Sequence, residues 1–206
     1  MGRDGARPSA AVAVAEGRKD KKSETRICSS AAFTLIEILI VIGIILFLAG
    51  LLLAVSGFVQ EKGKRSRAEA EIAAMSAALE SYKADNGIYP QSTDTNSLDP
   101  SSTNPASYVA SSKYLYMQLS GDSDDNPTTS SSSDTKNYFG SMLKPNMLTP
   151  SPPGANTSIR DPFGNSYGYS TAKASNPSGT IGYNPTYDLW STGGSITDTS
   201  KWIKNW

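Results

Sequence analysis

The residue types that most often carry out enzyme chemistry are scarce in this sequence. The chain of 206 residues contains no histidine, which is the commonest general base and the commonest transition-metal ligand. Its single cysteine is Cys28, so no disulfide can form within one chain. Ser-His-Asp and Cys-His catalysis are therefore excluded, and the sequence has no glycine loop of the kind that binds phosphate. We expect the protein not to be an enzyme.

One carboxylate lies where its chemistry has consequences. Residues 33–59 read FTLIEILIVIGIILFLAGLLLAVSGFV, and the 23 residues from 38 to 60 carry no charge. A helix of this length crosses the hydrocarbon core of a bilayer. Glu37 stands at the start of this run, where an unpaired carboxylate is costly. We expect Glu37 either to find a positive partner or to reach the aqueous interface.

The segment before the apolar run is basic. Residues 1–32 contain seven lysines and arginines against four acids, a net charge of +3, and we expect them to be a disordered leader. An ordinary secretory signal places its small residues after the apolar run. Here Ser30, Ala31 and Ala32 precede it. Cleavage between Ala32 and Phe33 would therefore leave the apolar helix on the mature protein.

The helix is predicted to continue beyond the apolar run. Ile72, Met75, Leu79 and Tyr82 recur at helical spacing, and no proline interrupts residues 33–85. The Asn86-Gly87 pair is a typical helix stop. We predict one helix made of a transmembrane part, residues 33–60, and an amphipathic part, residues 61–87.

The rest of the chain, residues 88–206, is predicted to form a small globular head. Tyr108, Leu115 and Leu119 favour a second, shorter helix, whereas residues 91–106 and 120–136 read as polar loops. Short aromatic runs between turn residues predict strands at 166–170, 187–191 and 201–206. The predicted fold is α+β: a long amino-terminal helix and a head that ends in a short antiparallel sheet.

Five segments together resemble the type IV pilin-like proteins, in particular the major pseudopilins of type II secretion systems. They are the FTLIE motif at residues 33–37 with its apolar helix, LESYKADNGIYP at 79–90, DPFGNSYGY at 161–169, YDLWSTGG at 187–194 and the terminal KWIKNW. Together they span the chain from residue 33 onward, although the middle region, about 91–158, matches poorly.

The resemblance implies a structural subunit of a helical filament. A prepilin peptidase would cut between Ala32 and Phe33 and methylate the new amino group of Phe33, and Glu37 would pair with that amino group on a neighbouring subunit. The implied partners are copies of the chain, the peptidase, and an inner-membrane assembly platform with its ATPase. The implied location is the inner membrane, crossed once, with the leader in the cytoplasm and the head outside it.

Three glycines in the apolar run are spaced by seven residues. Because seven residues are close to two helical turns, Gly43, Gly50 and Gly57 lie on nearly one face. Small residues let apolar helices approach closely, so we expect this face to pack against neighbouring helices. The alternative is that glycine is simply common in membrane helices.

Four basic residues follow the apolar run: Lys62, Lys64, Arg65 and Arg67. Their charge competes with the basic leader in setting the membrane orientation. They could meet acids such as Glu69 and Glu71 of adjacent subunits, or they could form a solvated stretch.

A calcium ion is the one cofactor that the resemblance implies, in the carboxy-terminal loop. Ser191 and Asp198 are the candidate ligands there, because calcium binds through oxygen atoms. A second candidate is the cluster Asp122-Ser123-Asp124-Asp125-Asn126, which also reads as a polar loop.

The alternative function is a binding module, a low-abundance minor pilin or surface adhesin. Such a protein could display Tyr108, Tyr114 and Tyr116 and the serine-rich loops to a ligand. The net charge of zero gives no bias toward nucleic acid, which we do not expect as a partner.

Overall fold

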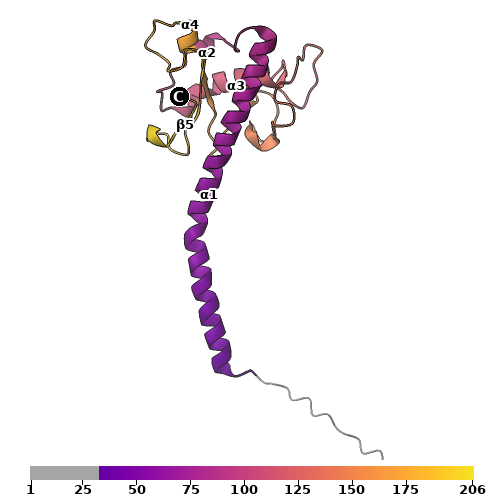
Figure 1. The fold of residues 1–206 in the computed structure, drawn as a ribbon. Helices are drawn as coiled ribbons and strands as arrows, with labels where there is room; N and C mark the ends of the chain where they lie inside the picture. The colour runs from indigo at the N-terminus through magenta and orange to yellow at the C-terminus, as the bar shows by residue number, and fades with distance from the viewer. Residues whose placement is uncertain (1–32) are drawn as a thin grey trace, which may run out of the picture. The chain divides into compact units, whose positions relative to one another are not determined.

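The computed structural model describes residues 33–206, so the predicted leader and Ala32 lie outside the described residues. The α+β prediction is confirmed: one long helix is followed by short helices and two small antiparallel sheets (Figure 1). The chain divides into two compact units, Met1–Leu48 and Ala49–Trp206. The long helix contributes to both of them.

This helix, α1, spans Leu35–Asn86 and has 52 residues, which confirms that the apolar and amphipathic runs form one helix. The predicted stop is confirmed as well. The Asn86 side chain donates to the Tyr82 carbonyl at 2.9 Å, and the Gly87 N–H donates to the Lys83 carbonyl at 2.7 Å. Gly87 has a φ of +80°, in the left-handed region that favours glycine, so the chain leaves the helix here without strain.

The amphipathic part of α1 supplies one wall of the head core. Ile72, Met75 and Leu79 of the predicted stripe are buried, and Tyr82 is half-buried with its hydroxyl donating to the Gln118 side chain at 2.9 Å. Because these residues recur at helical spacing, they present one apolar face to the rest of the head. The predicted stripe is therefore the face that packs.

Two helices and a 3₁₀ turn follow α1. They are α2 (Thr93–Ser97), η1 (Pro105–Tyr108) and α3 (Val109–Ser120). Tyr108, Leu115 and Leu119 are completely buried, as expected of the core face of the second predicted helix. Gly121 ends α3 with a φ of +77°, and a Cβ there would lie 2.4 Å from the Thr135 carbonyl oxygen. Only glycine fits where the polar loop 122–135 returns to α3.

The first sheet was not predicted from the sequence. After the turn η2 (Pro145–Met147), β1 (Leu148–Thr149) pairs antiparallel with β2 (Ser158–Ile159). Each strand has two residues, too few to show an alternating pattern.

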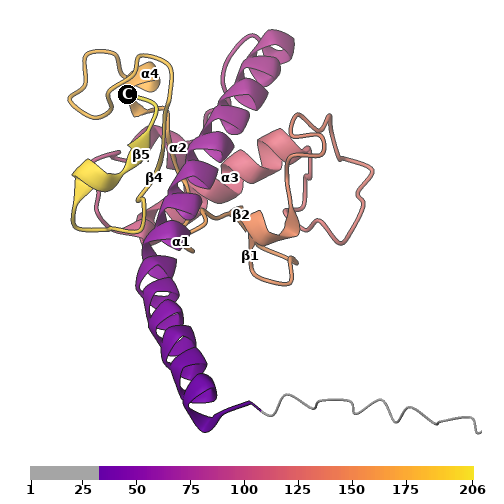
Figure 2. The same ribbon diagram turned by 60° about the horizontal axis from the view of Figure 1, so that its bottom comes forward.

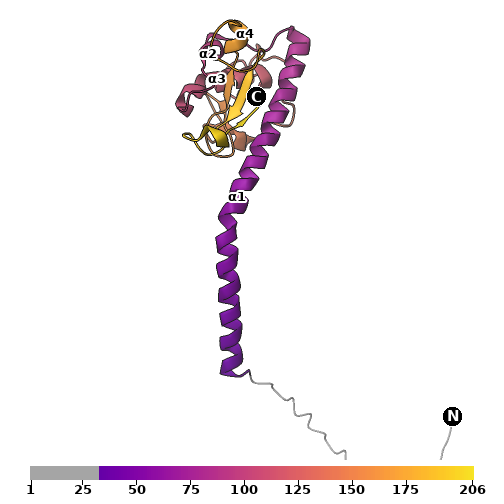
Figure 3. The same cartoon turned by 60° about the vertical axis from the view of Figure 1, so that its left-hand side comes forward.

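The second sheet contains the three predicted strands in shorter form. It is antiparallel, in the order β3 (Gly168–Ser170), β4 (Asp188–Ser191) and β5 (Ile203–Lys204). The helix α4 (Ala172–Ser175) follows β3, and the turn η3 (Thr199–Lys201) precedes β5. Figures 2 and 3 show these carboxy-terminal strands beside α1.

A close approach at the centre of the second sheet requires glycine. Gly168 of β3 stands opposite Trp190 of β4, and a Cβ at Gly168 would lie 2.0 Å from the indole ring. The indole is completely buried and meets the Tyr108 ring edge to face, with 5.1 Å between ring centres. The glycine of the Tyr167-Gly168-Tyr169 sequence is thus explained by packing.

Candidate functional site

The start of α1 positions the carboxylate that the sequence singled out. The Glu37 Oε2 atom accepts hydrogen bonds from the Thr34 N–H at 3.1 Å and the Thr34 hydroxyl at 3.0 Å. The Glu37 N–H donates to the Thr34 hydroxyl oxygen at 3.3 Å. This reciprocal arrangement is a capping box, which satisfies N–H groups that the first helical turn leaves unpaired.

The capping box is a local role for Glu37 that the sequence analysis missed. The signal was present, because Thr34-x-x-Glu37 has the spacing of a capping box directly before an apolar run. Only Oε2 takes part, and Oε1 has no hydrogen bond among the described residues. The carboxylate can therefore cap the helix with one oxygen and accept a cation with the other. Phe33, the residue before this box, is 77% exposed.

The amino-terminal part of α1 carries an uncovered apolar surface. Large apolar side chains from Phe33 to Val59 are exposed, among them Leu35 at 83% and Phe47 at 68%. In the described part of the chain, α1 is the helix long and apolar enough to cross a membrane. A surface of this kind in water would be a strong site of association, so it requires lipid or other protein around it.

The three spaced glycines lie within this surface. No atom lies within 4 Å of the position that a Cβ would take at Gly43, Gly50 or Gly57. Packing inside the described chain therefore gives no reason for glycine at these places. Contact with another helix remains the prediction for this face.

A buried carboxylate joins the amphipathic part of α1 to the head. The Glu71 Oε2 atom accepts from the Tyr167 hydroxyl at 2.7 Å, and its Oε1 accepts from Arg67 Nε at 2.6 Å. Glu71 is 8% exposed and Tyr167 is fully buried, whereas the Arg67 side chain is 42% exposed. Burial, and then the neighbouring Glu71 charge, raise the pKa of Tyr167, so its hydroxyl stays a donor.

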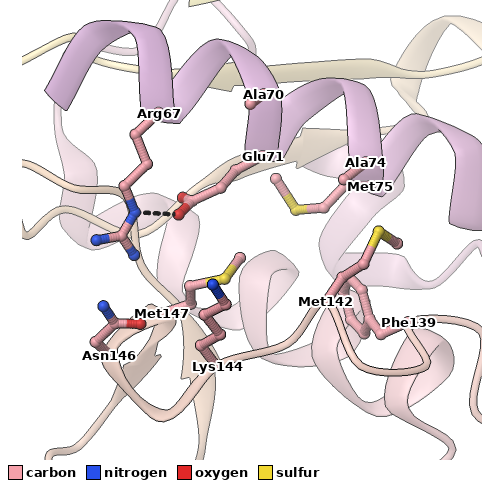
Figure 4. Close-up of a pocket in the computed structure, with 10 residues that line it drawn as sticks. All are labelled: Arg67, Ala70, Glu71, Ala74, Met75, Phe139, Met142, Lys144, Asn146 and Met147. Atoms are coloured by element: carbon pink, nitrogen blue, oxygen red, sulfur yellow. Dashed lines mark hydrogen bonds and ion pairs between the residues drawn. The ribbon is translucent and has the colours of Figure 1, made fainter. Parts of the chain in front are cut away.

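A pocket of about 370 Å³ opens beside this pair (Figure 4). Met75, Phe139, Met142 and Met147 form its apolar lining. Polar groups around it belong to Arg67 and the segment 144–146, and Figure 4 shows Arg67 turned toward Glu71. The pocket gathers no set of groups that would perform a reaction.

Two of the four basic residues after the apolar run have carboxylate partners inside the same helix. Arg65 lies 3.5 Å from Glu69, and Arg67 pairs with Glu71 as described. Both pairs have the i, i+4 spacing that brings side chains together on a helix. Glu71 is therefore paired within its own chain, which does not favour the alternative that it meets a basic residue of an adjacent subunit.

The two candidate calcium ligands lie in different surroundings. The Ser191 hydroxyl is buried and donates to Asp161 Oδ2 at 2.6 Å, whereas exposed Asp198 accepts from the Ser200 N–H at 3.1 Å. Among residues 33–206, no three histidine, cysteine or acidic side chains gather where they could hold a metal. Calcium usually takes six to eight oxygens, several of them carboxylates. Asp198 is the one carboxylate of this candidate pair, so calcium stays a prediction for this loop.

Asp161 is an organising residue that the sequence analysis named only as part of the segment DPFGNSYGY. Its Oδ1 accepts from the N–H groups of Phe163 at 3.0 Å and Asn165 at 2.9 Å, while its Oδ2 takes the Ser191 hydroxyl. Burial raises the pKa of Asp161, although these donors oppose the shift. The carboxylate thus joins the 161–165 turn to β4.

The acidic cluster at residues 122–126 forms a polar loop. Asp122 Oδ1 accepts from the N–H groups of Asp124 and Asn126, both at 3.2 Å, and Asp125 pairs with Lys113 at 2.5 Å. These bonds hold the loop by its own backbone and by α3. They explain the acids as turn residues.

The predicted display of three tyrosines is wrong for two of them. Tyr108 is completely buried and Tyr116 is 1% exposed. The hydroxyl of Tyr116 donates to Asp122 at 2.5 Å, and that of Tyr114 donates to the Gln91 carbonyl at 2.7 Å. The sequence analysis expected aromatic residues next to polar loops to face a ligand. They are buried instead, because their rings supply much of the apolar area of a small core.

Comparison with known families gives one match. The model of the family described as type II secretion system (T2SS), protein G, matches residues 58–139. The match covers less than half of the chain and supports a pseudopilin, type IV pilin-like family. No curated protein and no solved structure shows significant similarity to it.

The family match extends into the region that resembles the family poorly by its motifs. It begins at the end of the apolar run and continues through residues 91–139. The FTLIE motif and the segments after residue 139 lie outside the match. This pseudopilin family is a structural one that associates with membranes and assembles into filaments, rather than an enzyme class.

Proposed function

We propose that this pseudopilin is a structural subunit of a type II secretion pseudopilus or a related filament. In this proposal a peptidase cuts between Ala32 and Phe33, the amino group of Phe33 is methylated, and subunits assemble through α1. The observation that carries the proposal is the apolar surface of α1, which no other element of the described chain covers.

An uncovered apolar helix needs a partner in each state of the protein. Lipid would cover it while the subunit waits in the inner membrane, and other copies of α1 would cover it in the filament. The two environments are both apolar, so the transfer needs no new fold. Gly43, Gly50 and Gly57 would let the helices approach closely, since nothing in the described chain fills the space beside them.

Glu37 would set the axial position of each subunit relative to its neighbour during assembly. Cleavage before Phe33 creates an ammonium group that can donate to a carboxylate. In the described structure Glu37 uses Oε2 for its capping box and leaves Oε1 without a hydrogen bond. The free oxygen would accept the ammonium of a neighbouring Phe33, and pairing would lower the cost of a carboxylate in an apolar environment.

Two variants of Glu37 separate capping from charge pairing. Glutamine can still accept in a capping box, so Glu37→Gln keeps the cap and removes the charge, whereas Glu37→Ala removes both. We expect both variants to be cleaved, as shown by amino-terminal sequencing, and both to fail to form filaments in sheared fractions and electron micrographs. Normal filaments from Glu37→Gln would refute the pairing role.

The same assay tests the glycine face. Gly50→Leu should insert into the membrane and be cleaved, but should assemble poorly, while Gly50→Ala should assemble better because its side chain is smaller. Equal assembly of the two variants and the parent would contradict packing through this face.

The remaining parts of the proposal concern orientation and partners. We infer a single membrane pass with the leader in the cytoplasm and the head outside it. The partners would be other copies, the prepilin peptidase and the membrane platform with its ATPase. The adhesin alternative has less support, because Tyr108 and Tyr116 are buried.

Calcium stays a prediction for the loop after Ser191, with Asp198 its single carboxylate. If calcium binds there, the unfolding midpoint should be higher with calcium than with a chelator, and Asp198→Asn should abolish the difference. Magnesium serves as the control cation, since it tolerates irregular oxygen sites poorly. Equal midpoints with calcium and chelator would remove calcium from the proposal.

A further inference from the structure

A second pocket lies where the uncharged part of α1 ends. It has a volume of about 350 Å³. The residues of its lining that matter here are Gln60, Glu61, Lys64, Phe163, Gly193 and Gly194. The first three belong to α1, and the others belong to the turn after Asp161 and the loop after β4. All of them lie within the unit Ala49–Trp206.

The loop at residues 192–201 is held directly against α1. Arg65 Nη1 donates to the Lys201 carbonyl at 2.6 Å. A Cβ at Gly193 would lie 2.2 Å from that same carbonyl oxygen, and a Cβ at Gly194 would lie 2.7 Å from the Phe163 ring. Both glycines have positive φ values, +59° and +84°. The Gly-Gly pair therefore allows backbone, rather than side chains, to line this pocket.

The cations around the pocket are unequally paired. Arg65 and Arg67 have carboxylate partners in α1. Lys62 instead lies over the Phe58 ring at 4.8 Å, and Lys64 lies over the Phe163 ring at 6.0 Å. In the described part of the chain neither lysine has an ion pair with a carboxylate.

Glu61 is the one acid of the pocket, and it is exposed. The exposed Gly194 adds a backbone N–H that makes no hydrogen bond within residues 33–206. At this level of α1 the free Gly194 donor and two lysines without ion pairs in the described chain, Lys64 in the pocket lining and Lys62 just outside it, stand against one carboxylate, which suits an anionic ligand.

The position of the pocket along α1 indicates the source of that anion. Residues 38–60 carry no charge, and the pocket begins with the residues that close this run. When such a run spans a bilayer, the residues just beyond it lie among the lipid headgroups. Phe58 is 61% exposed beside Lys62, so its ring can enter the acyl region while the ammonium stays in the headgroup layer.

We propose that this pocket binds the phosphate of an anionic phospholipid, in the leaflet on the side of the head. Lys62 and Lys64 attract the headgroup, and the Gly194 N–H is available as a donor to a phosphate oxygen. The loop at residues 192–201 is thereby docked on the membrane until the subunit leaves the bilayer. The proposal rests on the proposed function in one respect, namely that α1 spans a membrane.

Charge and continuity favour lipid over a second copy of the chain. The unpaired lysines follow the spanning run directly, so the headgroup layer meets them without any further assembly step. Juxtamembrane lysines are attracted to anionic lipid at close range. An acidic segment of a second copy could fill the pocket only when that copy is present. Discs with one chain and discs with several chains therefore distinguish the two occupants.

The test uses the full chain in lipid nanodiscs that contain one chain each. Hydrogen exchange of the amides at residues 192–200 is compared in discs of phosphatidylcholine and in discs that also contain phosphatidylglycerol. We expect slower exchange with phosphatidylglycerol, and a loss of that protection of roughly fivefold for each lysine removed in Lys62→Gln/Lys64→Gln. The matched control, Lys83→Gln/Lys136→Gln, removes the same charge elsewhere and should keep the protection.

The control pair lies away from the pocket. Lys83 is 19 residues along α1 from Lys64, and Lys136 bonds to Asp85, which is 21 residues along, so both lie about 30 Å away. Equal exchange in the two kinds of disc, or equal losses in the two double variants, would overturn the proposal. Protection by inorganic phosphate in phosphatidylcholine discs would assign the pocket to a free anion instead. Protection that appears only with several chains per disc would assign it to a second copy.

The same data separate this inference from the proposed function. Amides at residues 38–56 should be protected in every disc if α1 spans the bilayer. Free exchange there would refute the membrane span itself. Protected α1 amides together with an unresponsive loop would refute the lipid site alone.

Discussion

The hydroxyl of Tyr167 tests how the head is fastened to α1. It donates at 2.7 Å to Glu71, and both residues are buried. Tyr167→Phe removes this hydrogen bond and leaves the Glu71 carboxylate with Arg67 as its remaining side-chain partner. A hydrogen bond to a charged group contributes about 1.5–3 kcal/mol, and the ring keeps its packing. We therefore expect the free energy of unfolding to fall by about that amount.

Urea unfolding of the full chain in mild detergent measures this loss. The three tryptophans, Trp190, Trp202 and Trp206, all lie in the head and report its unfolding by fluorescence. The midpoint should shift by the lost free energy divided by the urea slope, with the slope itself unchanged. The matched control is Tyr183→Phe, because Tyr183 is 54% exposed and its hydroxyl has no hydrogen bond in the described chain.

The control should change stability by no more than about 0.5 kcal/mol. If Tyr167→Phe and Tyr183→Phe have the same midpoint, the buried bond to Glu71 does not fasten the head and the reasoning fails. The loss should also be constant between neutral and mildly alkaline pH. The pKa of Tyr167 is raised by burial and by the Glu71 charge, so its proton is not lost in that range.

Two further predictions concern packing and pH. Gly168→Ala should destabilise the head by about 1–3 kcal/mol, because its Cβ would meet the buried Trp190 ring. Gly63→Ala should instead stabilise α1 by about 0.5–1 kcal/mol, because no atom lies within 4 Å of the added Cβ. Equal urea midpoints for the two variants would contradict this. Burial first, and then the hydrogen bond to Glu80, raise the pKa of Tyr89 to about 12 from an ordinary value of 10. The unfolded chain therefore loses this proton first, so stability is present below pH 10 and falls from pH 10 to 12. The free energy of unfolding of Tyr89→Phe should fall less steeply from pH 10 to 12 than that of the parent chain. Identical slopes for the two would refute the assignment to Tyr89.

The sequence by itself determined the elements whose signals are local. The uncharged run, the stripe at Ile72, Met75 and Leu79, and the stop at Asn86-Gly87 predict α1 because each depends on neighbours within a few turns. The Thr34–Glu37 capping box belongs to the same class, since its two residues are three apart. It was readable from the sequence although it was missed.

The tertiary structure alone decided which side chains meet across the head. Glu71 reads as one more acid on a helix until the fold brings Tyr167, 96 residues away, within 2.7 Å of it. Tyr108 reads as a tyrosine beside a polar loop until Trp190 closes over it. The two-residue strands β1 and β2 have no pattern of their own and exist through their pairing. Burial and partners across such separations depend on packing, which no local spacing encodes.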